Sequence, residues 1–484
     1  MLPSIDELQR IFVDFIKEGL RQNRDTNIHH QYGHSAAQQF WQTSKMKLGI
    51  GSLVVATAIA STTQAQCPDY TTYSQKPHGA PSTGPLALPF MRPEPACRTF
   101  NSSAVEKVIS DMKSLLRDPD LARLFENTFP NTLDTTVKYF NATENLAFII
   151  TGDITLISAQ WLRDTGNQFA HYISLLGVDP QLATLVKAVI NNEARYVAEY
   201  PYCGAFQPPP ESGLRPSHND WADGVTVNPP VNNQTVFECK YEIDSLCGFL
   251  KLSRSYYQAT KDASFINDNW KAAVKQVFRV INEQSQPTFD EDFNFISYYN
   301  WTGGHGALSP QVNNHGNNEP KAYTGLVGTH HRPSDDLSMF AFLTPANAML
   351  SVELKHLANI LDAIGQLPDV VDNIFAYEVN GFGGRYVMDD ANVPSLLSLP
   401  YLGFLDKKHP AYKATRKLLL SVKNPYFAAG KTFSGTGGPH VDPWHPWPMS
   451  QISAIFGTDD DQEILKSLYT IANVRHLLFI FDRQ

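Results

Sequence analysis

Apolar residues recur with a helical period along most of the chain. Val105, Ile109 and Met112 fall on one helical face, and Ser102 or Ser103 precedes them as an N-cap. Strand-like runs are few and short. Further helices are predicted over 119–140, 160–176, 180–200, 244–261, 263–284, 336–362, 393–404, 409–422, 447–457 and 459–478. Helices joined by long loops rich in Pro, Gly and Asn favour an all-α fold, a ring of helical hairpins.

The competing all-α arrangement is an α-solenoid. The sequence shows no internal repeat of about 33 to 47 residues, which lowers the odds of a solenoid. Residues 66–100 are rich in Pro, Ser and Thr and have little periodicity, so we expect an extended lead-in there. One domain is then predicted over 101–484.

Residues 46–65 have the three-part pattern of a secretory signal. Lys47 is followed by an apolar run and by Thr63-Gln64-Ala65, a small-residue cleavage site. The run is shorter than the roughly 20 apolar residues of a membrane span. We therefore expect translation to start at Met46, residues 1–45 to be no part of the mature protein, and secretion after cleavage behind Ala65. A buried helix and a membrane anchor in the secretory pathway are the alternatives.

Four sequons support a secretory route. Asn101, Asn141, Asn233 and Asn300 each begin an Asn-x-Ser/Thr triplet, and all lie downstream of the apolar run. The sequence therefore predicts a glycoprotein.

All five cysteines also follow the predicted cleavage site. In an oxidising compartment four of them can pair. We expect Cys67 to pair with Cys97, and Cys203 with Cys239, because each pair brackets a loop-like stretch. Cys247 lies in an apolar helical pattern and is expected to be a buried free thiol. No cysteine or histidine spacing indicates zinc.

Composition excludes several classes of function. The net charge is −9 and no Lys/Arg cluster is longer than a pair, so phosphate contacts of a nucleic-acid binder have no basic face to use. No GxSxG, HExxH or GxGxxG motif occurs, which removes the local signatures of serine hydrolases, zincins and dinucleotide enzymes. Aromatic residues make up 11% of the chain.

One motif joins the residue types that bind sugars. Trp161-Leu162-Arg163-Asp164 places a guanidinium and a carboxylate beside an indole. Charged groups of this kind grip hydroxyls, while an aromatic face covers the C–H patch of a sugar ring. An Arg–Asp pair beside a core tryptophan is the structural alternative.

Three more motifs carry carboxylates at predicted helix starts. Each is also compatible with helix capping or a turn. Helix starts on one face of a ring converge on a common cleft, and glycoside hydrolysis needs two carboxyl groups there, one protonated and one ionised. The acidic residues are Asp244, Asp335, Asp336, Asp389 and Asp390.

Six ordered motifs over about residues 101–470 resemble glycoside hydrolase family 125. They are Ile150-Thr-Gly-Asp153, Trp161-Leu-Arg-Asp164 with Asn167-Gln168, Lys240-Tyr-Glu-Ile-Asp244-Ser-Leu-Cys247, Arg332-Pro-Ser-Asp-Asp336, Met388-Asp-Asp-Ala-Asn-Val-Pro-Ser-Leu-Leu-Ser-Leu-Pro-Tyr401, and Gly437-Gly-Pro-His440 followed by Trp447-Pro-Met-Ser450.

The resemblance implies an (α/α)6 barrel that removes terminal α-1,6-linked mannose from mannoside oligosaccharides or N-glycans, with inversion. It implies no metal or other cofactor, no nucleic-acid partner and no stable membrane association. The Asp of the Tyr-Glu-x-Asp motif, here Asp244, is implied to be the general acid. Substrate-binding roles are implied for Trp161, Arg163, Asp164, Glu242, Arg332, Asp335, Asp336, Asp389, Asp390 and His440.

The C-terminal end departs from the family pattern. The family continues with a His-Glu-Ser segment, whose Glu the resemblance makes the general base, and with a Trp-Phe-Ala-Trp helix; here the sequence runs from Asn473 to Gln484 without either. We therefore expect impaired hydrolysis, as from a truncated or mis-spliced product. The carboxylates left for the base role are Asp164, Asp336, Asp389, Asp390 and Asp442.

Two other functions stay open. A carbohydrate-binding pseudoenzyme would keep the sugar clasp and lack the base. A metallohydrolase would use His440, Asp442 and His445, the only His/Asp cluster with ligand-like spacing, although Pro443 and Pro446 make that segment a loop.

Overall fold

The fold is seen in a computed structural model. It describes residues 67, 73, 76–152, 158–303, 316–361, 374–380, 384–430, 433–440 and 445–473. The predicted signal peptide and the departing C-terminal segment lie outside the described residues.

Ten α-helices lie in the described part of the chain. They are α3 (Ser103–Leu115), α4 (Pro119–Thr128), α5 (Leu162–Phe169), α6 (Pro180–Glu199), α7 (Ile243–Thr260), α8 (Asp268–Gln284), α10 (Thr344–Leu361), α11 (Pro410–Leu419), α12 (Pro448–Phe456) and α13 (Asp461–Asn473). None of these described helices is long and apolar enough to span a membrane.

Short antiparallel strands lie between the helices. They pair as β1 (Val137–Asn141) with β2 (Leu146–Ile149), β3 (Gln160–Trp161) with β4 (Ala205–Phe206) and β6 (Val236–Glu238), β5 (Thr226–Asn228) with β7 (Asn300–Thr302), β8 (Phe342–Leu343) with β9 (Glu378–Val379) and β10 (Arg385–Tyr386), and β11 (Phe427–Ala429) with β12 (Ser434–Thr436).

Local chemistry accounts for several helix starts. The Ser102 hydroxyl accepts a hydrogen bond from the Val105 N–H at 3.1 Å, which confirms Ser102 as the N-cap of α3. Asp179 caps α6 in the same way, accepting from the Leu182 N–H at 3.0 Å. Pro180 then occupies the first turn, where its missing N–H costs nothing.

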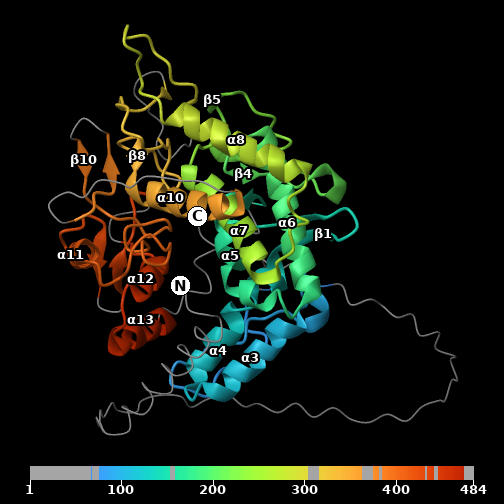
Figure 1. Ribbon diagram of the computed structural model, residues 1–484. Helices are drawn as coiled ribbons and strands as arrows, with labels where there is room; N and C mark the ends of the chain where they lie inside the picture. Colours follow the sequence, from blue (N-terminus) through green and yellow to red (C-terminus); the bar gives the residue numbers. More distant parts are fainter. Residues whose placement is uncertain are drawn as a thin grey trace, which may run out of the picture.

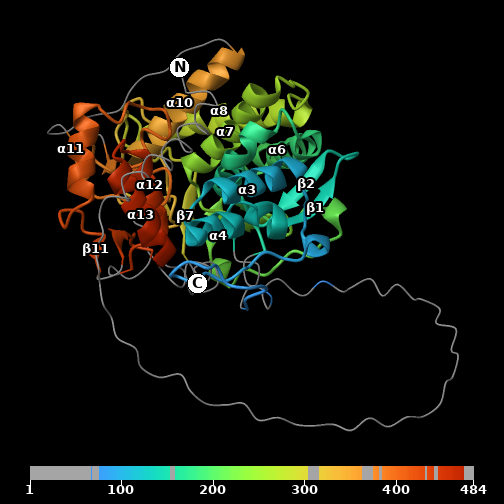
Figure 2. The same ribbon diagram turned by 90° about the horizontal axis from the view of Figure 1, so that it is seen from below.

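The helices pack as a ring of neighbours. α7 packs against α5, α6 and α10, and α6 also packs against α8. α12 and α13 lie together on the side opposite α6, as both Figure 1 and Figure 2 show. α13 contacts α4, where the Tyr469 hydroxyl donates to Asp118 at 2.7 Å. The chain thereby closes on itself across 351 residues of sequence.

A small sheet brings two helix starts together. β3 pairs with β4 and β4 with β6. β3 ends at Trp161, directly before α5, and β6 ends five residues before α7 begins at Ile243. The N-termini of α5 and α7 therefore lie side by side.

The disulfide predictions are confirmed. Cys67 bonds Cys97, and Cys203 bonds Cys239. Cys203 and Cys239 flank β4 and β6, so this bond ties the sheet beneath the start of α7. Cys247 is free and buried, also as expected.

Three helix predictions are wrong in part or in whole. The predicted helix 119–140 ends at Thr128; a π-helical turn and β1 follow, where a β-branched run favours strand. The predicted helix 336–362 begins only at Thr344, after β8.

Residues 393–404 form successive turns and no α-helix. Asp389 accepts hydrogen bonds from the N–H groups of Leu396 and Leu397, and Ser395 and Ser398 bond one another's backbone. Such side-chain bonds compete with a helical ladder for the same N–H groups.

Candidate active site

Arg163 lies at the centre of a cluster of carboxylates. It is in the first turn of α5 and is 6% exposed. Its guanidinium donates to Glu242 at 2.5 Å and to Asp244 at 3.3 Å, and it pairs with Asp164 at 3.1 Å. One buried cation therefore balances three acidic groups from two adjoining helix starts.

Two glycines allow α5 and α7 to approach closely enough for these contacts. A Cβ atom on Gly248 would lie 2.7 Å from the Arg163 Cα and 2.8 Å from the Leu162 carbonyl oxygen. A Cβ on Gly166 would lie 3.0 Å from the Gly248 carbonyl oxygen. Any larger residue at position 248 would push the two helices apart.

Asp244 is a buried carboxyl group in the first turn of α7. The N-cap residue of α7 is Glu242, so the alternative of Asp244 as an N-cap is wrong. Burial raises the pKa of Asp244 to about 6, and Arg163 opposes that shift. Its Oδ1 atom has no hydrogen-bond partner.

The pKa values of Glu242 and Asp335 are shifted in opposite directions. Burial, together with Asp335 and Asp244, raises the pKa of Glu242 well above its usual value, against the pull of Arg163. Burial acts to raise the pKa of Asp335 too, but Lys240 and Arg163 outweigh it, and the pKa is lowered. Asp335 also has a left-handed backbone, with φ 67°, a strained conformation of a kind that clusters at functional sites.

A second group of site residues lies on loops. His440 Nδ1 is 3.9 Å from Asp336 Oδ1. Burial raises the pKa of Asp336 to about 6; His440 lowers it and Asp390 raises it. Gly438 leaves room for Asp390, because a Cβ there would lie 3.0 Å from Asp390 Oδ2. Asp336, Asp390 and His440 are therefore close enough to influence one another.

Arg332 is held in this second group by Glu378. The Arg332 Nε donates to Glu378 Oε1 at 2.6 Å, and the other Glu378 oxygen accepts from the N–H groups of Met339 and Phe340 at 2.9 and 3.1 Å. The guanidinium also lies 5.7 Å from the ring centroid of Tyr386. Glu378 thus fixes both the arginine and the loop that follows Asp336.

Two residues with predicted substrate-binding roles make structural contacts. Asp389 is fully buried, and its two oxygens accept from backbone N–H groups, which favours the turn alternative for it. Trp161 is 9% exposed and packs edge-on against Phe237, with ring centroids 5.6 Å apart. These contacts fit the alternative of a core tryptophan.

Several site residues carry buried polar atoms without a partner. A buried polar atom normally has a hydrogen bond. Water, or a ligand with hydroxyl groups that both donate and accept, would supply the missing bonds. The atoms are Glu242 Oε1, Asp244 Oδ1, Asp335 Oδ1, Asp390 Oδ2 and His440 Nδ1.

The expectation of four acidic helix starts is half right. Asp164 and Asp244 lie in first helical turns, whereas Asp336 and Asp390 lie in loops. Sequence reasoning gave no role to Glu378 or to Glu238, which pairs with Lys240 at 3.0 Å beside the site. The sequence gives a weak indication of the Glu238 role, because Glu238 stands two residues before Lys240 at the end of a strand. It gives no indication of the Glu378 role. Asp442 lies outside the described residues.

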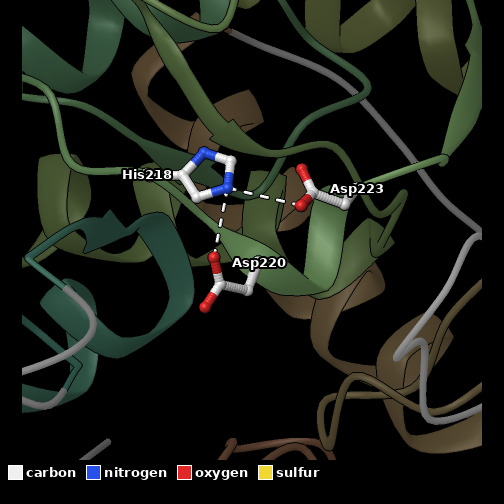
Figure 3. A group of neighbouring side chains, drawn as sticks. All are labelled: His218, Asp220 and Asp223. Atoms are coloured by element: carbon white, nitrogen blue, oxygen red, sulfur yellow. Dashed lines mark ion pairs between the residues drawn. The ribbon is translucent and has the colours of Figure 1, made fainter.

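One other group of possible metal ligands lies in the described part of the chain. His218 pairs with Asp220 at 3.1 Å and with Asp223 at 3.4 Å (Figure 3). All three side chains are exposed. The arrangement is that of a surface ion-pair group, and no buried polar atom in it indicates a bound cation.

A ring of helices with an arginine–carboxylate cluster, in which one buried carboxyl group has a raised pKa, fits a glycoside hydrolase. A sequence model of the metal-independent α-mannosidases matches residues 118–370 and 366–482. The chain belongs to this family, glycoside hydrolase family 125, and its fold is the all-α (α/α)6 barrel. The family resemblance seen in the sequence is thereby confirmed.

Two relatives show how far the likeness extends. The meiotically up-regulated gene 157 protein of Schizosaccharomyces pombe is 44% identical over 432 residues, which cover 83% of this chain and 84% of that protein. A metal-independent α-mannosidase of Streptococcus pneumoniae, solved in a non-productive complex with α-1,6-mannobiose, is similar with a TM-score of 0.67. It is 25% identical, and the match covers 77% of this chain and 89% of that one. The chain is therefore a mannosidase-type glycoside hydrolase.

Proposed function

We propose that the protein removes single terminal α-1,6-linked mannose units from mannoside oligosaccharides or N-glycans, with inversion, and that Asp244 is the general acid. The observation that supports this most is the state of Asp244. It is buried, its pKa is raised to about 6, and one oxygen has no hydrogen-bond partner. A carboxyl group of this kind keeps its proton in mildly acidic solution and can give it to the leaving glycosidic oxygen.

Both groups of the site, the Arg163 cluster and the loop residues around Asp336, can bind the terminal sugar. Arg163 with Asp164, and Arg332 with Asp336, can hold neighbouring hydroxyls through charge-assisted hydrogen bonds. We infer that such contacts enclose the end of a sugar chain, which would favour exo action. The solved relative is a complex with α-1,6-mannobiose, which supports the linkage proposed here.

We propose that the general base is a carboxylate of the second group, on the loops. Inversion needs an ionised carboxylate about 6.5–9.5 Å from the acid, with a water between them. Both oxygens of Asp389 already accept backbone hydrogen bonds, so it suits the role poorly. Asp390 is the better candidate among the described residues of this group, because its Oδ2 has no hydrogen-bond partner. Burial raises the pKa of Asp336 to about 6, so Asp336 favours the protonated form in the same mildly acidic range in which Asp244 keeps its proton.

We also propose that the protein passes through the secretory pathway. The two disulfides support this, because disulfides persist in oxidising compartments. Mass spectrometry of the protein from its native host would show a mature N-terminus at Gln66 and glycans on the four sequons. An unprocessed, unglycosylated chain would contradict the proposal.

Product analysis tests the activity. The protein is incubated with α-1,2-, α-1,3- and α-1,6-mannobiose and with a linear α-1,6-mannan, and the first-formed anomer is read by NMR. We expect hydrolysis of the α-1,6 substrate, release of single mannose units and β-mannose as the first product. First-formed α-mannose would contradict inversion, and larger fragments would contradict exo action. Binding without turnover would point to the carbohydrate-binding alternative.

A further inference from the structure

An exposed hairpin follows α8. The Asp290 N–H donates to the Asn294 carbonyl at 3.0 Å and the Ile296 N–H to the Thr288 carbonyl at 3.0 Å, so Thr288 to Ile296 form two short antiparallel arms. Phe289 faces Phe295 across them. In Figure 1 the yellow segment after α8 projects from the body of the molecule.

Hydrogen bonds hold the hairpin at its base and at its tip. At its base, Lys321 donates to the carbonyl oxygens of Gln284 and Gln286 at 2.5 Å each, and the Lys321 N–H bonds the buried Thr288 hydroxyl at 2.9 Å. At its tip, the Asp290 carboxylate accepts from the Asn294 backbone at 2.7 Å and the Asn294 amide at 3.0 Å. The tip is therefore a defined turn.

Aromatic side chains cover this hairpin although it faces solvent. Phe293 at the tip is 85% exposed and has a left-handed backbone, with φ 62°. Phe289 and Phe295 are 37% and 42% exposed, and their rings meet edge to face with centroids 5.5 Å apart. A strained backbone that holds a bare phenyl ring in water needs a reason in function.

The segment after the hairpin leads back to the proposed acid. Tyr298, 41% exposed, packs its ring near Tyr202, with centroids 5.7 Å apart, and the Arg279 guanidinium lies 5.6 Å from the same ring. The next residue, Tyr299, is buried, and its hydroxyl accepts from the Tyr241 N–H at 3.1 Å, three residues before Asp244. The hairpin thus continues directly into the segment that packs against the motif carrying the acid.

Charge restricts what can cover this surface. Asp290, Glu291 and Asp292 lie at the tip, and no Lys, Arg or His occurs from 285 to 300. Arg279 of α8 contacts the base of the hairpin, 5.6 Å from the Tyr298 ring, and not its tip. These acids would repel an anionic lipid surface and a second copy of the same hairpin. A neutral polyhydroxyl chain suits the site, because its C–H faces stack on phenyl rings and its hydroxyls donate to carboxylates.

We infer that the 288–298 hairpin is an outer carbohydrate-binding platform, which stacks on mannose units of the oligosaccharide beyond the bond that is cleaved. The inference rests on the proposed exo action, in which the rest of the glycan leaves the pocket on its reducing side. The platform would give the enzyme a preference for long mannosides over mannobiose.

The test compares substrate lengths. We measure kcat/KM for α-1,6-mannobiose and for α-1,6-mannopentaose with wild type, Phe293→Ala and Phe293→Trp. Phe278→Ala, which removes another exposed phenyl ring from α8, is the matched control. We expect Phe293→Ala to lower the pentaose-to-biose ratio about three- to tenfold, while Phe293→Trp and Phe278→Ala keep the wild-type ratio.

Each other outcome is informative. An unchanged ratio in Phe293→Ala, or an equal loss on both substrates, would overturn the platform while mannobiose turnover still supports the proposed function. A Phe293→Ala change in sedimentation from dimer to monomer would show an interface between copies instead. If mannobiose is not cleaved at all, the proposed function fails, and calorimetry with mannopentaose then decides the platform: equal affinity of wild type and Phe293→Ala overturns it.

Discussion

The two halves of the site are built differently. Arg163, Asp164, Glu242 and Asp244 lie at the adjoining starts of α5 and α7, where close helix packing and a disulfide-tied sheet hold them. Asp336, Asp390 and His440 lie on loops. The helical half carries the buried acid and its counter-charge, which need fixed geometry. The loop half carries the proposed general base and Arg332, so we expect changes there to affect substrate binding and turnover more than stability.

The largest effect is expected from removing the central charge of the helical half. Arg163→Met leaves Glu242 and Asp244 buried without their cation, which we expect to cost about 3–5 kcal/mol of unfolding free energy and to abolish turnover. Urea unfolding and mannobiose hydrolysis measure the two losses.

Arg254→Met is the matched control for that change. Arg254 makes a two-pronged pair with Glu353 between α7 and α10, at 2.8 and 2.9 Å, outside the site. This variant should lose comparable stability and keep turnover in its folded fraction. Equal loss of activity in both variants would show that Arg163 acts only through folding.

A smaller loss of stability is expected from the disulfide beneath the helical half. Replacing Cys203 and Cys239 by Ser removes the covalent link between the segments that carry β4 and β6 and should cost about 2–4 kcal/mol, with lowered kcat. The equivalent change of Cys67 and Cys97 affects the lead-in and should lower stability without lowering kcat. Thermal unfolding measures the loss of stability in each variant, and steady-state kinetics measures kcat. Equal kcat values in the two variants would contradict a special role of the Cys203–Cys239 bond.

The smallest effect should come from the loop half. Glu378→Gln removes the negative charge that orients Arg332 but keeps an oxygen acceptor, so we expect KM to rise about tenfold and the free energy of unfolding to fall by less than in Arg163→Met. Glu353→Gln, at the pair outside the site, should leave KM unchanged. A large fall in Tm for Glu378→Gln with an unaltered KM would show a purely structural role.

The same contrast explains what the sequence could predict. Helix starts are signalled by neighbouring residues: Ser102 and Asp179 cap their helices through bonds three residues away, so those boundaries were predicted. The disulfides followed from the loop-like stretches that they bracket. The family motifs located Arg163 and Asp244, and local spacing placed them near helix starts.

The loop half could not be predicted in this way. Glu378 meets Arg332 across 46 residues of sequence, and neither residue's neighbours signal the other. The helix predicted over 393–404 failed because Asp389 takes the N–H groups of Leu396 and Leu397, a tertiary bond pattern that apolar periodicity does not show.

The central claim is that Asp244 gives its proton to the leaving oxygen. The most direct measurement compares Asp244→Asn with wild type on α-1,6-mannobiose and on an aryl α-mannoside whose leaving group needs no proton, across pH 4 to 8. We expect the variant to lose about 10²- to 10⁴-fold on mannobiose and to keep most of its rate on the aryl substrate.

The pH profile carries the same information. Since burial raises the pKa of Asp244 to about 6, the wild-type rate on mannobiose should fall as the pH rises through that value and the acid loses its proton. That fall should vanish in the variant. Mannobiose turnover by Asp244→Asn at the wild-type rate, or equal losses on both substrates, would contradict the account.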